Sequence, residues 1–291
     1  MRITQTMLQD NLLRNLFASQ KEMDKYFTQI YTGKKIRRPS EDPVIAMRGI
    51  NYRTELTEIE QYKRNASGIW KWMDHADDAL DKATNVLHRM EELAVQASND
   101  TLTVAERESI AKEVRQLRDQ MVDIANTQVS GRYIFNGTDT DVAPVQDGQI
   151  IAGEGRNQEV RVEIAKDITI PINLNPDDVF DEGLFENIDF FIDALENGNQ
   201  ADIDESIGNI NDSMTKIVQG RAELGARMNR LELIEDRLEH QAIIAEDIMK
   251  TNEGVDFEEA VTNLLTQEVI HRAALSAGSK IIQPSLVDFL R

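Results

Sequence analysis

The residues of this chain that could carry out acid–base or metal chemistry are few and scattered. The chain has no cysteine, so disulfides, thiolate catalysis and cysteine-ligated zinc are excluded. Its histidines lie far apart and show no metal-ligand spacing: His75, His88, His240 and His271. No Ser/His/Asp set and no catalytic pair of carboxylates stands out. The sequence therefore predicts neither an enzyme nor a protein with a metal or other cofactor.

The remaining polar clusters have simple structural explanations. The acidic residues between 177 and 182 precede a predicted short helix and lack EF-hand spacing, so helix capping is favoured over a calcium site. Asp139 and Asp141 follow an Asn-Gly pair, where turn chemistry is favoured. The glycines at 153–155 lack the strand and helix that flank a phosphate-binding loop, so they predict an ordinary loop.

The overall charge excludes one class of partner. Lys and Arg total 32 and Asp and Glu total 52, which gives a net charge of −20. Nucleic-acid binding depends on Lys and Arg to neutralise phosphates, so it is not expected here. No apolar run approaches the ~20 residues that span a bilayer, and early polar residues such as Arg2 and Gln5 argue against a cleaved secretory signal.

The two ends of the chain share a pattern of apolar residues at alternating spacings of four and three. This spacing keeps one narrow stripe on one side of a helix, as in the seam of a coiled coil. We call these residues the assembly seam: Leu12, Leu16, Met23, Tyr26 and Ile30 near the N-terminus, and Phe257, Val261, Leu264, Leu275, Ile282 and Phe289 near the C-terminus. The pattern predicts that the ends pair with each other or with neighbouring subunits.

Long helices are expected between these ends, because two long segments contain no proline. Asp42 and Pro43 form a helix start, and one heptad phase continues to a break near Ser98. Thr103 and Glu106 have the form of a capping box and restart a helix, which we expect to reach about Val129. A second long helix covers 203–249, where glycines, above all Gly220, predict a local kink or break.

The segment between these helices is different. Period-two alternation at 160–164 and 168–172, with Asn-Gly and Asp-Gly turn pairs, predicts a small antiparallel hairpin or meander covered by a short helix. The predicted fold is therefore mainly α, an elongated long-helix bundle or coiled coil built from both chain ends, with a small antiparallel β insertion in the middle.

The predicted domains follow from this organisation. Residues 1–43 and 254–291 form terminal coiled-coil arms, 44–131 with 201–253 form a helical rod, and 132–200 form the β-rich insertion with its short helix. Burial of the few large seam residues falls short of the entropy lost on ordering both arms. We therefore expect residues 1–40 and 255–291 to be mobile in a monomer and to become ordered on assembly.

Several motifs, taken in order along the chain, resemble one family. They are Thr32–Pro43 with its Gly turn and acidic helix start, the helix break at 96–101, Arg132–Thr138, the glycine-containing helix at 220–231, and the final segment 277–291. Together they resemble the flagellin-like axial proteins of the bacterial flagellum. Within that superfamily the chain looks most like the hook-associated proteins of the FlgL type, the smaller proteins of the hook–filament junction.

The resemblance implies a structural function outside the cell. Such subunits are exported unfolded by the flagellar type III apparatus and fold into a ring at the hook–filament junction. Their partners are further copies of themselves, the larger junction protein, flagellin and an export chaperone, with no nucleic acid and no membrane insertion. We expect the chaperone to bind the last apolar residues, which are Leu275, Ile281, Ile282, Leu286 and Phe289.

Two other functions fit the same heptads. The chain could be a flagellin, the subunit of the filament itself, or a coiled-coil scaffold with no connection to the flagellum. The proline-bearing motif at 39–43 and the segment 132–144 favour the junction protein over the filament subunit.

Overall fold

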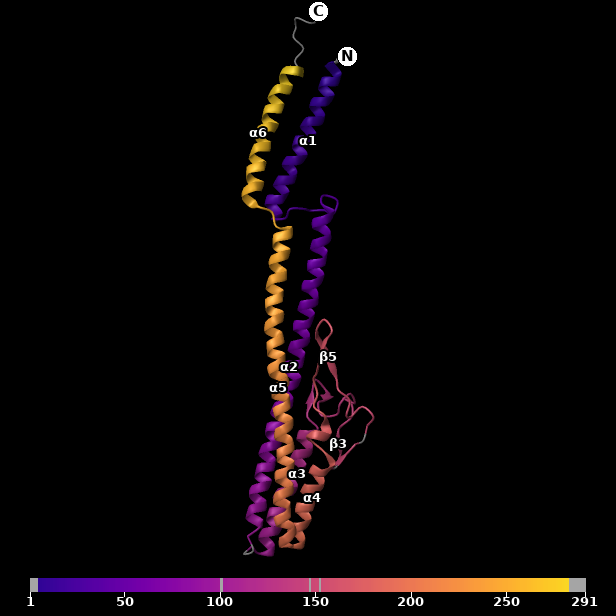
Figure 1. Ribbon diagram of the computed structural model, residues 1–291, viewed down its shortest axis with the longest axis vertical. Helices are drawn as coiled ribbons and strands as arrows, with labels where there is room; N and C mark the ends of the chain where they lie inside the picture. The colour runs from indigo at the N-terminus through magenta and orange to yellow at the C-terminus, as the bar shows by residue number, and fades with distance from the viewer. Residues whose placement is uncertain (1–4, 100–101, 147, 152, 283–291) are drawn as a thin grey trace, which may run out of the picture. The chain divides into compact units, whose positions relative to one another are not determined.

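The computed structural model of the protein describes residues 5–99, 102–146, 148–151 and 153–282, and Figure 1 shows that long helices dominate them. The α-helices are α1 (Gln5–Thr32), α2 (Pro43–Ala97), α3 (Val104–Ala125), α4 (Glu182–Asn197), α5 (Gln200–Glu253) and α6 (Phe257–Ile282). The strands are β1 (Gln128–Val129), β2 (Arg132–Tyr133), β3 (Val145–Gln146), β4 (Gln149–Ile150), β5 (Arg161–Ala165) and β6 (Ile168–Pro171). The predicted mainly helical fold with a small β insertion is confirmed.

The chain divides into two compact units. The terminal unit comprises Met1–Glu58 with Ala242–Arg291, and the central unit comprises Ile59–Gln241. The boundary between them falls inside α2 and α5. The three-part division expected from the sequence stays a prediction. No described helix is long and apolar enough to cross a membrane.

Local capping explains where the helices begin. The Asp42 carboxylate accepts hydrogen bonds from the backbone N–H groups of Val44 and Ile45, at 2.9 and 3.0 Å, and Pro43 occupies the first helical position of α2. Thr103 and Glu106 form the predicted capping box at the start of α3. The predicted break before this capping box is confirmed, since α2 ends at Ala97.

The core of the central unit lies along α2. Two sets of residues at heptad spacing are buried there: Ala66, Met73, Leu80, Leu87 and Ala94 in one, and Ile69, Ala76, Ala83, Met90 and Ala97 in the other. A stripe this wide needs partners on more than one side. Arg89 pairs with Glu113 of α3, and Arg221 of α5 holds both Asp77 and Asp81 of α2, with Nε 2.7 Å from Asp77 Oδ1.

Helix α5 continues through all of its glycines, so of the kink or break expected near Gly220 the break is wrong and the kink stays a prediction. Its buried positions keep the predicted phase at Ile203, Ile210, Ile217, Leu224, Leu231, Leu238 and Ala245. Gly220 allows close packing at this point of α5 and does not interrupt the helix. A Cβ at this position would lie 2.7 Å from Cγ2 of the buried Val179.

Helix α3 ends at Ala125, four residues before the predicted end at Val129. The backbone N–H of Asn126 closes the helix on Val122, and Gln128–Val129 then pair with Arg132–Tyr133 as a β-hairpin. Ser130 and Gly131 form its two-residue turn with φ values of 53° and 79°. A local turn with positive φ, well suited to a hairpin, therefore ends the helix.

The insertion consists of three separate antiparallel pairs, β1–β2, β3–β4 and β5–β6. The predicted period-two strands form β5 and β6, which pair Val162 with Ile170. Helix α4 buries its predicted apolar face, Phe185, Ile188, Phe191, Ile192 and Leu195, and packs mainly against α3, with a smaller contact to β4.

The three glycines of α5 provide a matched test of close packing. Gly225→Ala places a methyl group in open space and should raise the free energy of unfolding by about 0.5–1 kcal/mol, since glycine is a poor helix residue. Gly220→Ala should lower it, because the methyl group meets Val179. Urea unfolding followed by circular dichroism measures both, with Gly208→Ala as a second open-space control. Equal stabilisation by all three substitutions would contradict this packing.

Candidate assembly surface

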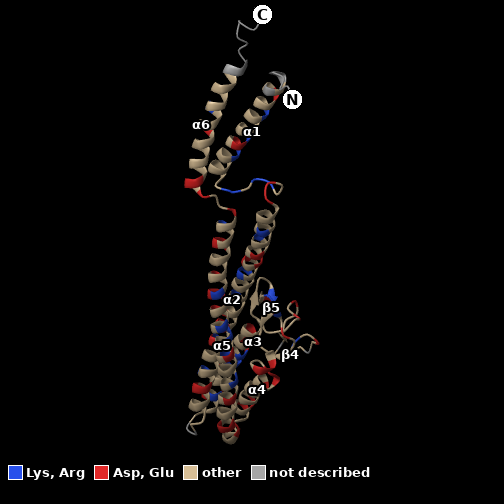
Figure 2. Ribbon diagram, turned by 45° about the horizontal axis from the view of Figure 1, so that its top comes forward, with Lys and Arg blue, Asp and Glu red and all other residues tan. Residues whose placement is uncertain are grey.

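In the terminal unit, α1 and α6 lie side by side and run in opposite directions (Figures 1 and 2). Two contacts fix their register. At one end Lys34 and Gly254 form an antiparallel bridge, and further along the pair a Cβ on Gly278 would lie 2.6 Å from Cδ2 of Leu12. The two ends of the chain therefore pair with each other in this structure.

The N-terminal seam residues occupy the covered side of α1. Leu12, Leu16, Met23, Tyr26 and Ile30 are all half-buried, and Ser19, at the same spacing, is buried. Only a narrow stripe is covered, because α1 has one partner helix within the unit.

The C-terminal seam residues divide into three groups. Val261 and Leu264 are half-buried, whereas Phe257 and Leu275 are 59% and 48% exposed. The side chain of Ile282 and the whole of Phe289 lie outside what the structure describes. The covered stripe also contains Ala260, which the sequence reasoning missed because a small residue gives little signal in an apolar pattern. The assignment of these residues to contacts between subunits stays a prediction.

A polar layer interrupts this pair. Ser19 Oγ and His271 Nδ1 are buried without a hydrogen-bond partner in the structure. Leu12 lies against Gly278 in an antiparallel pair. Position 19, seven residues after Leu12, therefore falls opposite position 271, seven residues before Gly278. Buried polar atoms without partners carry a cost, so this layer weakens the helix pair locally.

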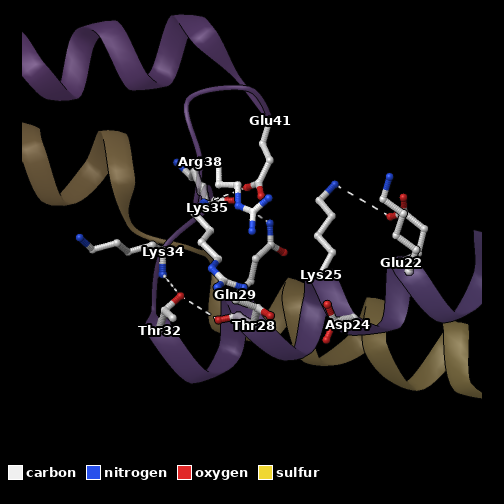
Figure 3. Close-up of a pocket in the computed structure, with 12 residues that line it drawn as sticks. Glu22, Asp24, Lys25, Thr28, Gln29, Thr32, Lys34, Lys35, Arg38 and Glu41 are labelled. Carbon is white, nitrogen blue, oxygen red and sulfur yellow. Dashed lines mark hydrogen bonds and ion pairs between the residues drawn. The ribbon is translucent and has the colours of Figure 1, made fainter.

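The linker between α1 and α2 (residues 33–42) and the linker between α5 and α6 (residues 254–256) are hydrogen-bonded to each other. We call this contact the linker junction. The backbone N–H of Val255 donates to Gly33 O at 3.0 Å, and that of Lys35 donates to Glu253 O at 2.7 Å. The Gln29 side chain donates to Lys35 O at 2.7 Å, and Figure 3 shows it reaching from α1 towards the linker. Gly33, with φ of +68°, makes the turn that ends α1.

The carboxylate of Glu253 joins this linker junction to α2. Its side chain is only 13% exposed, and it forms ion pairs with Arg53, at 2.6 Å from Nη2 to Oε1, and with Lys34 at 3.7 Å. A Cβ on Gly49 would lie 2.5 Å from Glu253 Oε1, so this glycine leaves room for the carboxylate. A half-buried charge with two cations holds the crossing chain segments in one arrangement.

The linker between α1 and α2 carries Lys34, Lys35, Arg37 and Arg38, and it appears as a blue stretch in Figure 2. The Arg37 backbone N–H donates to the Glu41 carboxylate at 2.8 Å, which is the main cause that lowers the pKa of Glu41; the nearby guanidinium groups act in the same direction. This stabilisation of the linker is therefore present at neutral pH and is lost as pH falls below the ordinary value of 4.5.

Exposed apolar side chains concentrate in the terminal unit. Of 22 large apolar residues that are exposed among the described residues, 16 belong to it, although it contains fewer residues than the central unit. On α1 and α6 they are Met7, Leu13, Phe17, Phe27, Tyr31, Phe257, Leu265, Val269, Ile270 and Leu275. Exposed apolar surface of this kind is typical of sites where proteins bind one another.

The net charge, in contrast, lies almost entirely in the central unit. The central unit has 18 Lys and Arg against 37 Asp and Glu, a net charge of −19. The terminal unit has 14 against 15, a net charge of −1. Charged surfaces repel one another and remain hydrated, so the nearly neutral terminal unit is the part suited to close packing between subunits.

The described residues contain no group of three or more metal-binding side chains. Asp181 caps α4, accepting a hydrogen bond from Leu184 N at 2.9 Å, and Asp177 pairs with Arg156. Asp139 accepts a hydrogen bond from Gly155 N at 3.0 Å within a loop. The acidic clusters thus cap helices and order loops, as the sequence reasoning favoured.

Comparison with known proteins identifies the family. The model of the bacterial flagellin N-terminal helical region matches residues 3–140, and that of the C-terminal helical region matches residues 207–290. The chain belongs to the bacterial flagellin family. The resemblance seen in its motifs is confirmed.

One relative and two solved structures illustrate the similarity. Flagellar hook-associated protein 3 of Escherichia coli strain K12 is 27% identical, over 94% of each chain. A flagellar hook-associated protein of Vibrio parahaemolyticus, described as putative, has the same fold, with a TM-score of 0.69 and 24% identity over 74% of this chain and all of that one. FlgL of Bacillus cereus is similar, with a TM-score of 0.61 and 22% identity over 69% of this chain and 99% of that one. Relatives of this kind are structural flagellar proteins, which argues against an enzymatic role.

Glu253 provides the test of the linker junction. In the assembled protein, where the terminal arms are expected to be ordered, Glu253→Gln keeps the shape of the side chain and removes its charge, so hydrogen exchange at Lys35 and Val255 should become about tenfold faster, equivalent to ~1.4 kcal/mol. Glu246→Gln, which alters an exposed pair with Lys250 on the same helix, is the control. Unchanged exchange in Glu253→Gln would show that the charge does not hold the junction.

Proposed function

We propose that this protein joins the hook to the filament, as a ring of subunits at the hook–filament junction outside the cell. The observation that carries this proposal is the apolar surface of α1 and α6, which a lone chain leaves in water. The match of both chain ends to flagellin helical regions supports it, since membership in this family implies association with other axial proteins.

The assembly seam lies at the contacts between subunits in this proposal. The N-terminal seam residues hold α1 against α6, while Phe257 and Leu275 remain exposed and meet neighbouring chains. The neutral terminal unit packs among other subunits, and the acidic central unit stays hydrated. Contacts between different surfaces of successive copies build a ring or a helical array.

The partners follow from this position. Copies of the same chain form the ring, the larger hook–filament junction protein lies on the hook side, and flagellin lies on the filament side. The terminal arms become ordered as these contacts form, because burial of their outer apolar side chains then offsets the entropy of ordering.

Export requires that the chain travel unfolded through the flagellar type III apparatus. The absence of cysteine supports this route, because no disulfide can form during transfer to an oxidising exterior. Before export the apolar C-terminal helix needs protection from aggregation, and an export chaperone supplies it.

The proposed chaperone site is the end of α6 and the residues after it. Leu275 is 48% exposed, and Ile281 and Ile282 lie in the last turn of α6. Leu286 and Phe289 lie outside the described residues. Because these residues also fall within the proposed assembly surface, chaperone binding and assembly exclude each other, which prevents early polymerisation.

A deletion strain tests the junction function. Without this protein, cells should carry hooks that lack filaments and should release flagellin monomers into the medium, since export continues while attachment fails. Electron microscopy and analysis of the medium measure the two effects, and the intact gene supplied in trans should reverse both. Missing filaments without released flagellin would instead indicate the filament subunit, and normal motility would indicate a non-flagellar scaffold.

The chaperone site is tested with aspartate substitutions. Leu275→Asp combined with Ile282→Asp should weaken binding of the export chaperone at least tenfold in calorimetry, because two apolar contacts are lost. Val218→Asp, at an exposed apolar position of the central unit, should leave binding unchanged. The proposed site is wrong if the double variant binds as tightly as the unaltered chain.

A further inference from the structure

A cleft of about 350 Å³ lies beside the linker that connects α1 to α2. Its apolar wall includes Ile36, Pro39 and Ile50, and its rim carries Arg37 and Arg38. Ile50 is 57% exposed, so this wall is open to solvent in the single chain.

The rim cations are available to a ligand. The side chains of Arg37 and Arg38 are exposed and lie within 4.0 Å of no carboxylate among the described residues. Their neighbours Lys34 and Arg53 are already paired with Glu253. A second cleft of about 280 Å³ is also lined by Arg37 and Arg38, and Figure 3 shows Arg38 beside Glu41 there. The site thus combines an apolar wall with two cations that influence Glu41 but form no ion pair within 4.0 Å among the described residues.

The start of α6 is complementary to this cleft, because it combines an exposed aromatic side chain with acidic residues. Phe257 is 59% exposed, and Asp256, Glu258 and Glu259 surround it in the sequence. One oxygen of Asp256 caps the helix, 3.1 Å from the backbone N atoms of Glu258 and Glu259, whereas the carboxylates of Glu258 and Glu259 form no described ion pair. Figure 2 shows the red start of α6 and the blue linker.

We propose that the cleft of one copy binds the Asp256–Glu259 segment of a second copy. Phe257 covers the apolar wall, and Glu258 and Glu259 pair with Arg37 and Arg38. The occupant comes from another chain because Phe257 stays exposed in its own, where the backbones of Val255 and Glu253 are already hydrogen-bonded to Gly33 and Lys35. This inference rests on the proposed assembly function and names one contact within it.

The two surfaces of this contact are different, so it joins copies head to tail and can repeat around a ring. The apolar side chain at the centre and the charge pairs around it follow the usual anatomy of a protein interface. The charges also set direction, because two linkers or two α6 starts would repel each other.

Charge reversal tests the pairing in cells that carry the variant as their only copy. Arg37→Glu with Arg38→Glu should reduce the number of filaments at least tenfold while secretion of the protein continues, and so should Glu258→Arg with Glu259→Arg. All four substitutions together should restore filaments, because the pairs re-form with opposite polarity. Arg230→Glu with Arg237→Glu, at exposed positions of the central unit, should leave filaments unchanged. Failure of the fourfold variant to restore filaments would overturn the pairing.

Cross-linking identifies the occupant. Ile50→Cys and Phe257→Cys introduce single thiols into a chain without cysteine, and the two variants are co-produced in one cell. A short bismaleimide applied to isolated flagella should give a species of twice the chain mass that contains both variants. A product with flagellin or with the larger junction protein, or no product, would overturn the second copy as occupant.

These outcomes separate the two proposals. The unaltered chain must first restore filaments to the deletion strain, which tests the junction function. If it does so while the cross-link or the charge rescue fails, the contact is wrong and the function stands. If it does not, the function itself fails.

Discussion

The structure depends on one constraint: the two terminal helices cannot bury their apolar residues within a single chain. Each helix covers one narrow stripe with the other, and the remaining faces keep residues such as Phe17 and Val269 exposed, at 69% and 66%. Burial of a large apolar side chain is worth about 1.5–3 kcal/mol, so ten such residues on α1 and α6 provide a strong drive towards association. Electrostatic repulsion between terminal units is small, because almost all of the net charge lies in the central unit.

The linker junction fixes how the chain segments next to α1 and α6 cross each other. An apolar surface alone would associate in many ways, but Glu253, Arg53 and Lys34 hold the crossing segments together. The cleft beside the linker is lined by Arg37 and Arg38. Charge complementarity adds direction to the non-directional hydrophobic effect.

Much of this fold is readable from the sequence, because its signals are local. Heptad spacing in α5, the capping residues Asp42 and Thr103, and the alternation in β5 and β6 each depend on nearby residues and predicted their elements correctly. The break expected at Gly220 does not occur, and the close approach of Val179 to this glycine is a contact that no local pattern reveals. The end of α3 was misplaced because the hairpin turn at Ser130 and Gly131 competes with helix continuation.

The candidate site was less predictable for the same reason. The stripe on α1 follows the expected spacing, whereas on α6 small and polar residues share the covered side and dilute the signal. The Glu253 junction joins residues about 200 positions apart and has no motif of its own. The difference in net charge between the two units could not be predicted from the sequence, because it depends on a unit boundary that only the structure provides.

The most direct test of the account is thiol labelling of assembled flagella. Phe17→Cys and Val269→Cys place single thiols on the terminal unit, and Val218→Cys and Leu233→Cys place them on the central unit, all at exposed positions. In the purified monomer all four should react with a maleimide. In isolated flagella the account predicts that the two terminal thiols are protected at least tenfold while the two central thiols still react. Equal labelling of all four in the assembled state would contradict it.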